Sequence, residues 1–152
     1  MDIALLKQAP IFADLDEGEL ARVVEVCKEQ KFQGAETVFK EGEPGNRLFL
    51  IAEGEVRISR NIPGSGEEAL AVLKKGSVFG EMAIFDHSER STDAIANTDS
   101  VLLTISRSDF ELLLDFNRDI AYKVLWAAVR ILSARLRVTN DNLRSFLAMS
   151  MF

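Results

Sequence analysis

The sequence is poor in the side chains that most often build metal and redox sites. It has 152 residues but only one cysteine, Cys27, and one histidine, His87. A single cysteine excludes an internal disulfide, a cysteine-based zinc site and a cysteine-held iron–sulfur cluster. A single histidine excludes multi-histidine metal sites and leaves little for histidine-dependent catalysis. We therefore expect no metal, no other cofactor, no catalytic residues and no enzymatic activity.

Long apolar stretches are also missing. No run approaches the roughly 20 residues that a helix needs to cross a bilayer, and the first seven residues lack the pattern of a signal peptide. Apolar residues make up 47% of the chain and charged residues 28%, a balance typical of a folded globular protein. We expect one cytoplasmic domain over residues 1–152, without a membrane partner.

Positive charge is scarce over most of the chain. The net charge is 18 − 24 = −6; residues 1–116 hold 12 basic and 22 acidic residues, and residues 117–152 hold six and two. The two parts therefore carry net charges of −10 and +4. An acidic chain disfavours non-specific nucleic-acid binding, so we expect no nucleic-acid partner. The basic end is either a solvated helix or a face for a partner.

The two ends of the chain have helical patterns. Asp16 and Glu19 form a capping-box pattern, and apolar residues at helical spacing follow. Cys27 lies on that apolar face, which indicates a small buried hydrophobe rather than a reactive thiol. We assign the N-terminal helices to residues 1–30 and the C-terminal helices to residues 107–152, with a break near Asn117.

Residues 31–106 have the pattern of a small antiparallel β-structure. Glycines recur between short runs of β-forming residues, at residues 37–39, 48–51, 56–58, 70–73, 91–96 and 101–105. Residues 61–67 are rich in turn formers and predict a hairpin loop. The fold class is therefore α+β, mainly β, with a barrel or sandwich between N-terminal helices and a long C-terminal helix.

Residues 120–147 contain neither glycine nor proline and predict an unusually long helix with two apolar stripes. We expect the first stripe to pack on the β body: Ile120, Val124, Ala127, Ile131, Ala134 and Val138. The second has coiled-coil spacing and predicts a homodimer through this helix: Leu125, Val129, Leu132, Leu136, Thr139, Leu143 and Phe146. Thr139, the polar member of this seam, either bonds back to the preceding turn or makes a hydrogen bond that the interface needs.

The segment from residue 78 to residue 92 carries the most informative chemistry. Gly80 ends a strand, and the helical turn expected after it offers free backbone N–H groups to an anion. Arg90 can hold a phosphate with two hydrogen bonds, and Ser91 adds a hydroxyl donor. Glu81 only accepts hydrogen bonds, which fits a sugar hydroxyl. These groups describe a nucleotide monophosphate site; a surface salt bridge between Glu81 and Arg90 is the alternative.

The FGEMA motif at residues 79–83, followed by Arg90 and Ser91, resembles the phosphate-binding cassette (residues 79–92) of cyclic nucleotide-binding domains. Other segments also resemble that family: the glycine-bearing strands at 42–51 and 53–56, the opening at 11–15, and a helix like that of the catabolite activator protein group at 135–140. The resemblance implies a double-stranded β-helix, a jelly-roll-like β-roll. It also implies a cyclic nucleotide ligand, with cAMP favoured and cGMP left open.

The resemblance also implies roles for single residues. Glu81 would bind the ribose 2′-hydroxyl and Arg90 the cyclic phosphate, while Thr139 and Asn140 would reach the adenine, partly across the dimer. The implied binding residues are Gly80, Glu81, Met82, Ala83, Arg90, Ser91, Thr139 and Asn140. Asp93 departs from the family pattern: its carboxylate would repel the phosphate if it pointed there, but it could instead pair with Arg90 or face solvent.

The predicted function is that of a cyclic-nucleotide sensor, which signals through its dimer or through an unknown downstream partner protein. One alternative is a β-roll assembly module that has lost its ligand. Another is a fragment of a Crp/Fnr-type transcription regulator, because residues 148–152 are too few for a helix-turn-helix. A cupin-type metal enzyme is excluded by the single histidine.

Overall fold

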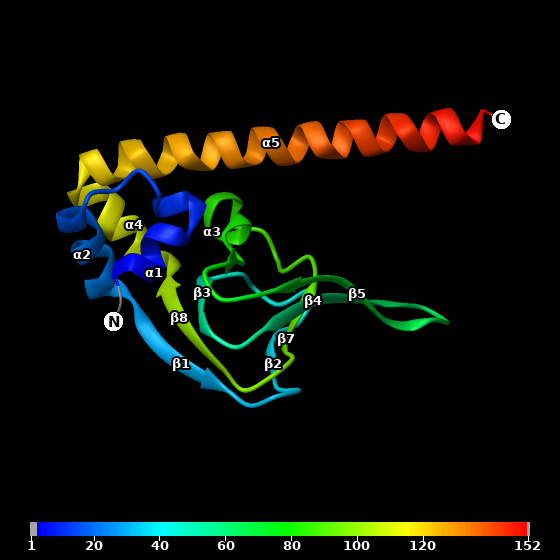
Figure 1. Cartoon of the computed structure of the whole chain (residues 1–152), viewed down its shortest axis with the longest axis horizontal. Coiled ribbons are helices and arrows are strands. Elements are labelled where there is room, and N and C mark those ends of the chain that lie inside the picture. The colour runs from blue at the N-terminus through cyan, green and yellow to red at the C-terminus, as the bar shows by residue number, and fades with distance from the viewer. Residues whose placement is uncertain (1–2, 152) are drawn as a thin grey trace.

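The protein, described over residues 3–151 by a computed structural model, has helices before and after the strands of a β-roll, and these helices gather on one side of the roll (Figure 1). The elements before the strands are α1 (Ile3–Gln8), the 3-10 helix η1 (Pro10–Phe12) and α2 (Glu17–Val26). The elements after them are α4 (Arg107–Phe116) and α5 (Arg118–Ser150). The predicted capping box is confirmed, because Asp16 accepts from the Glu19 N–H at 2.8 Å and Glu19 accepts from the Asp16 N–H at 3.0 Å.

Two four-stranded sheets form the roll, and every neighbouring pair of strands is antiparallel. The first has the order β1 (Lys28–Phe32), β8 (Ser100–Ser106), β3 (Arg47–Glu53), β6 (Val78–Phe79). The second has the order β2 (Thr37–Phe39), β7 (Asp93–Ala96), β4 (Val56–Ile62), β5 (Gly66–Leu73). The short helix α3 (Met82–Asp86) lies between β6 and β7 along the chain. The predicted α+β fold with an antiparallel β-roll is confirmed.

Strand β3 divides the interior because its side chains alternate between two faces. Leu48 and Leu50 pack with the helices in one core, and Phe49 and Ile51 pack in the other, between the sheets. In the second core the ring of Phe49 stacks on that of Phe79, with centroids 5.1 Å apart. Because Phe79 is the last residue of β6, these stacked rings lie next to the segment that follows that strand.

The roll begins earlier than predicted. The sequence predicts helices over residues 1–30, but β1 starts at Lys28, two residues after the end of α2. Its first four side chains are exposed, and only Phe32 is buried. The strand is held by its pairing with β8 and not by an apolar face, so it has no alternating pattern that the sequence could display.

Helix α5 packs on the body only through its N-terminal part. Ile120, Val124 and Ala127 are buried, and Ile131 is partly buried. Ala134 and Val138, further along the helix, are exposed, so the prediction that they pack on the body is wrong. With 33 residues, α5 alone gives the fold a larger share of helix than a mainly β protein has. Within residues 3–151, no helix is long and apolar enough to cross a membrane.

Candidate functional site

The site is built on a sharp change of direction at Gly80, where β6 ends. Gly80 has φ +78°, a left-handed conformation that favours glycine. A Cβ atom there would lie 2.7 Å from Nη1 of Arg90 and 3.2 Å from the Arg47 carbonyl oxygen. Glycine is therefore required both by the backbone conformation and by the close approach of the arginine.

Arg90 is buried, with 6% of its surface exposed. Its guanidinium donates to the carbonyls of Gly80 at 3.0 Å and Arg47 at 2.7 Å. Its Cζ lies 4.2 Å from the centroid of the Phe39 ring, a cation–π contact. Burial lowers the pKa of Arg90, and the nearby charge of Arg107 lowers it further. The group keeps its charge, because an arginine does not lose its proton in proteins.

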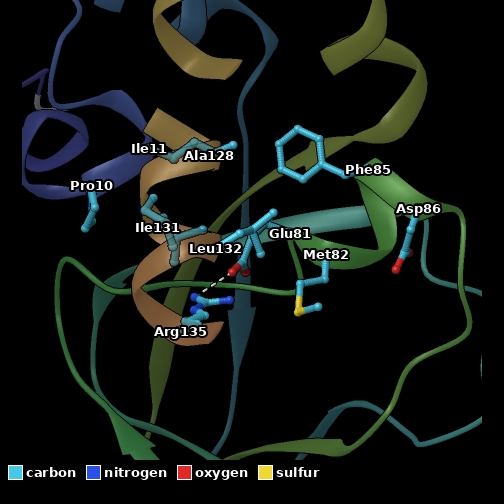
Figure 2. A pocket seen from close by; sticks show the side chains of 11 residues that line it. Pro10, Ile11, Glu81, Met82, Phe85, Asp86, Ala128, Ile131, Leu132 and Arg135 are labelled. Carbon is cyan, nitrogen blue, oxygen red and sulfur yellow. Dashed lines mark ion pairs between the residues drawn. The ribbon is translucent and has the colours of Figure 1, made fainter. Parts of the chain in front are cut away.

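Glu81 pairs with α5 and not with Arg90. Its Oε1 lies 2.8 Å from Nη2 of Arg135, and the two side chains are 14% and 51% exposed. The dashed line in Figure 2 marks this contact. The alternative of a Glu81–Arg90 salt bridge is therefore wrong. Arg135 was not among the predicted binding residues, because helical periodicity treats it as one more solvated charge on a long helix.

Six predicted binding residues line one cavity of about 510 Å³: Gly80, Glu81, Met82, Ala83, Arg90 and Ser91. Arg135, Asp86 and Glu89 add further charges to its lining, and Phe39, Ile58 and Phe79 give it an apolar wall. The volume lies in the ~300–1,000 Å³ range of small-molecule sites. A buried cation, an exposed hydroxyl and a carboxylate thus line one open cavity beside apolar side chains.

The structure does not bring Thr139 and Asn140 to this cavity. Both are exposed on α5, and the Thr139 hydroxyl donates to the carbonyl of Arg135 at 2.9 Å. Thr139 follows Arg135 by four residues, which corresponds to about 6 Å along a helix axis. The two residues therefore lie roughly one turn beyond the lining of the cavity.

Asp93 is turned away from the cavity. Its Oδ1 accepts a hydrogen bond from the Glu41 backbone N–H at 2.7 Å. The carboxylate does not pair with Arg90; it remains partly exposed to solvent and is bonded to a backbone donor on the neighbouring loop. Asp93 is not among the residues that line the cavity, so its carboxylate does not face a phosphate bound there.

A small apolar crevice separates α3 from α5 (Figure 2). It has a volume of about 150 Å³ and lies between η1, α3 and α5. Phe85 of α3 and Ile131 and Leu132 of α5 line it, and Glu81 and Arg135 also contribute. Apolar side chains of α3 and α5 thus face each other across the crevice, and the ion pair of Glu81, the residue before α3, with Arg135 spans it.

Metal-binding side chains do not gather in the part of the chain that the structure describes. No three His, Cys, Asp or Glu residues there lie close enough together to hold a metal ion. His87 is exposed, ends α3 with φ +57°, and has its Nε2 3.5 Å from Oε1 of Glu111.

The chain is similar to several characterised proteins. The cyclic nucleotide-binding domain family matches residues 29–117. The chain is 32% identical over 139 residues to the CRP-like cAMP-activated global transcriptional regulator of Mycobacterium tuberculosis, a match covering 91% of this chain and 60% of that protein. It is 34% identical over 109 residues to the cyclic AMP receptor protein of Thermus thermophilus, covering 72% and 50%.

A solved structure extends the similarity to the fold. The N-terminal domain of a transcriptional regulator from Streptomyces coelicolor has a TM-score of 0.81 and 33% identity, over 91% of this chain and 94% of that one. The matches to the two curated relatives span 60% and 50% of their lengths, so this chain corresponds to only part of each.

Proposed function

The chain belongs to the cyclic nucleotide-binding domain family, and we propose that it binds a cyclic mononucleotide, with cyclic AMP favoured, in the cavity lined by the cassette. One observation carries the proposal: the buried guanidinium of Arg90 faces the same cavity as Glu81 and Ser91. A buried positive charge without a carboxylate partner is suited to an anion.

The phosphate would bind at Arg90. The guanidinium has five N–H donors, and two hydrogen bonds to carbonyls account for only part of them. Ser91, the next residue along the chain, lines the same cavity and offers a hydroxyl. Arg90 is held in place by those carbonyls and by the Phe39 ring, so little side-chain freedom is lost when an anion binds.

The ribose would bind at Glu81. A carboxylate has two oxygens with about four acceptor positions, so Glu81 can accept from a sugar hydroxyl while it remains paired with Arg135. The preference for cyclic AMP over cyclic GMP rests on the names of the relatives, a cAMP-activated regulator and a cyclic AMP receptor protein.

The signal would leave the site through α5. Arg135 touches the ligand-binding carboxylate and stands on the helix whose apolar seam is exposed. Two chains paired along that seam would form a dimer, and Thr139 and Asn140 would reach the adenine from one or both chains. Thr139→Ala is then expected to weaken binding by about 1 kcal/mol, the net value of an ordinary hydrogen bond.

Calorimetric titration with cyclic AMP, cyclic GMP and 5′-AMP tests this function. We expect saturable binding of one nucleotide per chain, tightest for cyclic AMP and weakest for 5′-AMP. If neither cyclic AMP nor cyclic GMP bound, the assembly-module alternative would be favoured. The absence of catalysis and the cytoplasmic location stay predictions of the sequence.

A second candidate function is the sensory part of a DNA-binding regulator. One observation favours it: the curated regulator from Mycobacterium tuberculosis matches this chain over 60% of its length. The intact mass of the protein isolated from its source distinguishes the two. A mass above that of the 152 residues supports the regulator, and an equal mass supports a sensor that acts through a partner protein.

A further inference from the structure

Arg107 is the first residue of α4, and its side chain contacts the cassette. Its Nη2 donates to the carbonyl of Ala83 at 2.9 Å and also to the carbonyl of Gly45. Its backbone N–H donates to the carbonyl of Asn46 at 2.8 Å. Arg107 thus joins α4, the loop between β2 and β3, and α3 through one side chain and its own backbone.

Helix α3 depends on such contacts for its position. It has only five residues, and helices this short are not stable by themselves in water. The neighbouring loop also touches it closely, since a Cβ atom on Gly45 would lie 2.1 Å from the Cβ of Ala83. The Arg107 bridge spans this same contact, so it fixes the distance between the loop and α3.

Arg107 also brings a second positive charge close to Arg90. Each guanidinium donates hydrogen bonds to backbone carbonyls. Among residues 3–151, neither has a carboxylate within ion-pair distance. The Nε atom of Arg107 is buried without a hydrogen-bond partner. Burial lowers the pKa of Arg90 most and the charge of Arg107 lowers it further, while the charges of Glu43 and Glu81 act in the opposite direction. An anion near Arg90 would relieve the repulsion between the two cations.

We propose that Arg107 is a positioning residue for the phosphate site, which fixes α3 against the Gly45 loop and strengthens the positive potential at Arg90. This inference rests on the proposed function. Because the charge of Arg107 acts on Arg90, its loss is expected to weaken mainly the phosphate contact and to affect the ribose and the base less.

Titration of the wild type, Arg107→Gln and Arg107→Lys with cyclic AMP and with adenosine, which lacks the phosphate, tests the proposal. Arg118→Gln is the control, because it removes an exposed positive charge from the start of α5. We expect Arg107→Gln to bind cyclic AMP roughly tenfold more weakly, the loss of one or two hydrogen bonds, with a smaller loss in Arg107→Lys. Adenosine affinity should stay within about twofold. Equal losses for both ligands, or no loss for cyclic AMP, would overturn the proposal.

Amide hydrogen exchange without nucleotide gives an independent readout. The His87 N–H donates to the carbonyl of Ala83, the same group that Arg107 contacts. We expect this amide to exchange faster in Arg107→Gln than in the wild type and Arg118→Gln. If the wild type bound no cyclic nucleotide, the proposed function and the phosphate role would both fail. If binding were intact but His87 exchange were unchanged in Arg107→Gln, only the positioning role would be overturned.

Discussion

The carboxylate of Glu81 in the cassette and the guanidinium of Arg135 on α5 form an ion pair, with Oε1 and Nη2 2.8 Å apart. The two residues are 54 positions apart in the sequence and belong to the two parts of the chain that have opposite net charge. The pair closes one side of the cavity that also holds Arg90. It is therefore the direct contact between the proposed ligand site and the helix proposed to form the dimer.

The strength of this pair can be measured by a double-mutant cycle with Glu81→Gln and Arg135→Gln. Arg135 is half exposed, so the attraction is screened by water, and we expect a coupling of about 0.2–1 kcal/mol. Urea unfolding of the four proteins gives the value. The coupling should shrink in high salt. Strictly additive effects at low salt would show that the pair does not join the cassette to α5 in solution.

Gly45→Ala is expected to destabilise the protein by about 1–3 kcal/mol, the usual cost of an overpacked contact. The added methyl group would overlap the Cβ of Ala83 at 2.1 Å and displace α3. Gly18→Ala is the control: a Cβ there meets only the Asp16 carboxylate at 3.4 Å, inside helix α2. Because alanine favours helix over glycine, Gly18→Ala should leave stability unchanged or raise it. Thermal unfolding that ranked the two variants the other way would contradict the packing at Gly45.

Leu136→Glu is expected to convert a dimer into a monomer. Leu136 is 60% exposed and stands in the middle of the apolar seam, where a leucine buried against a second copy contributes roughly 1.5–3 kcal/mol. Ala134→Glu is the matched control, because Ala134 is exposed but lies outside the seam. Sedimentation velocity of the wild type and both variants measures their oligomeric state. A Leu136→Glu protein that still dimerises would place the interface elsewhere.

The thiol of Cys27 is expected to react slowly in the folded protein. Burial raises its pKa to about 12, so the folded protein holds almost no thiolate at pH 8. A thiol reagent should therefore modify the folded chain at least about 100-fold more slowly than the urea-unfolded chain. Because only the unfolded thiol ionises above its ordinary pKa near 9.0, stability should also fall as the pH rises beyond that value. Equal reaction rates would contradict the burial of Cys27.

Local patterns were sufficient to predict most of the elements. The capping box at Asp16 marked the start of α2, and the absence of glycine and proline marked α5. Strand β1 was not predicted because an exposed strand has no apolar alternation and because its partner β8 lies about 70 residues further along the chain. The sequence also did not predict where along α5 the buried part ends, because periodicity shows which face is apolar but not how far the body extends beneath it.

The candidate site was predictable at the cassette, where the motif holds Gly80, Glu81 and Ala83 within a few residues. Contacts made by distant residues were not. Nothing in the spacing pairs Arg135 with Glu81, or turns Asp93 toward the Glu41 backbone. These contacts depend on the three-dimensional course of α5 and of the loop after β2.

The dissociation constant of cyclic AMP for the wild type and for Arg90→Leu tests the central claim most directly. The account predicts that the wild type binds one nucleotide per chain and that Arg90→Leu binds more weakly by about 2–4 kcal/mol, or ~30- to 1,000-fold. Circular dichroism of the variant should first show that it is folded. An unchanged dissociation constant in folded Arg90→Leu would contradict the assignment of the phosphate to the buried guanidinium.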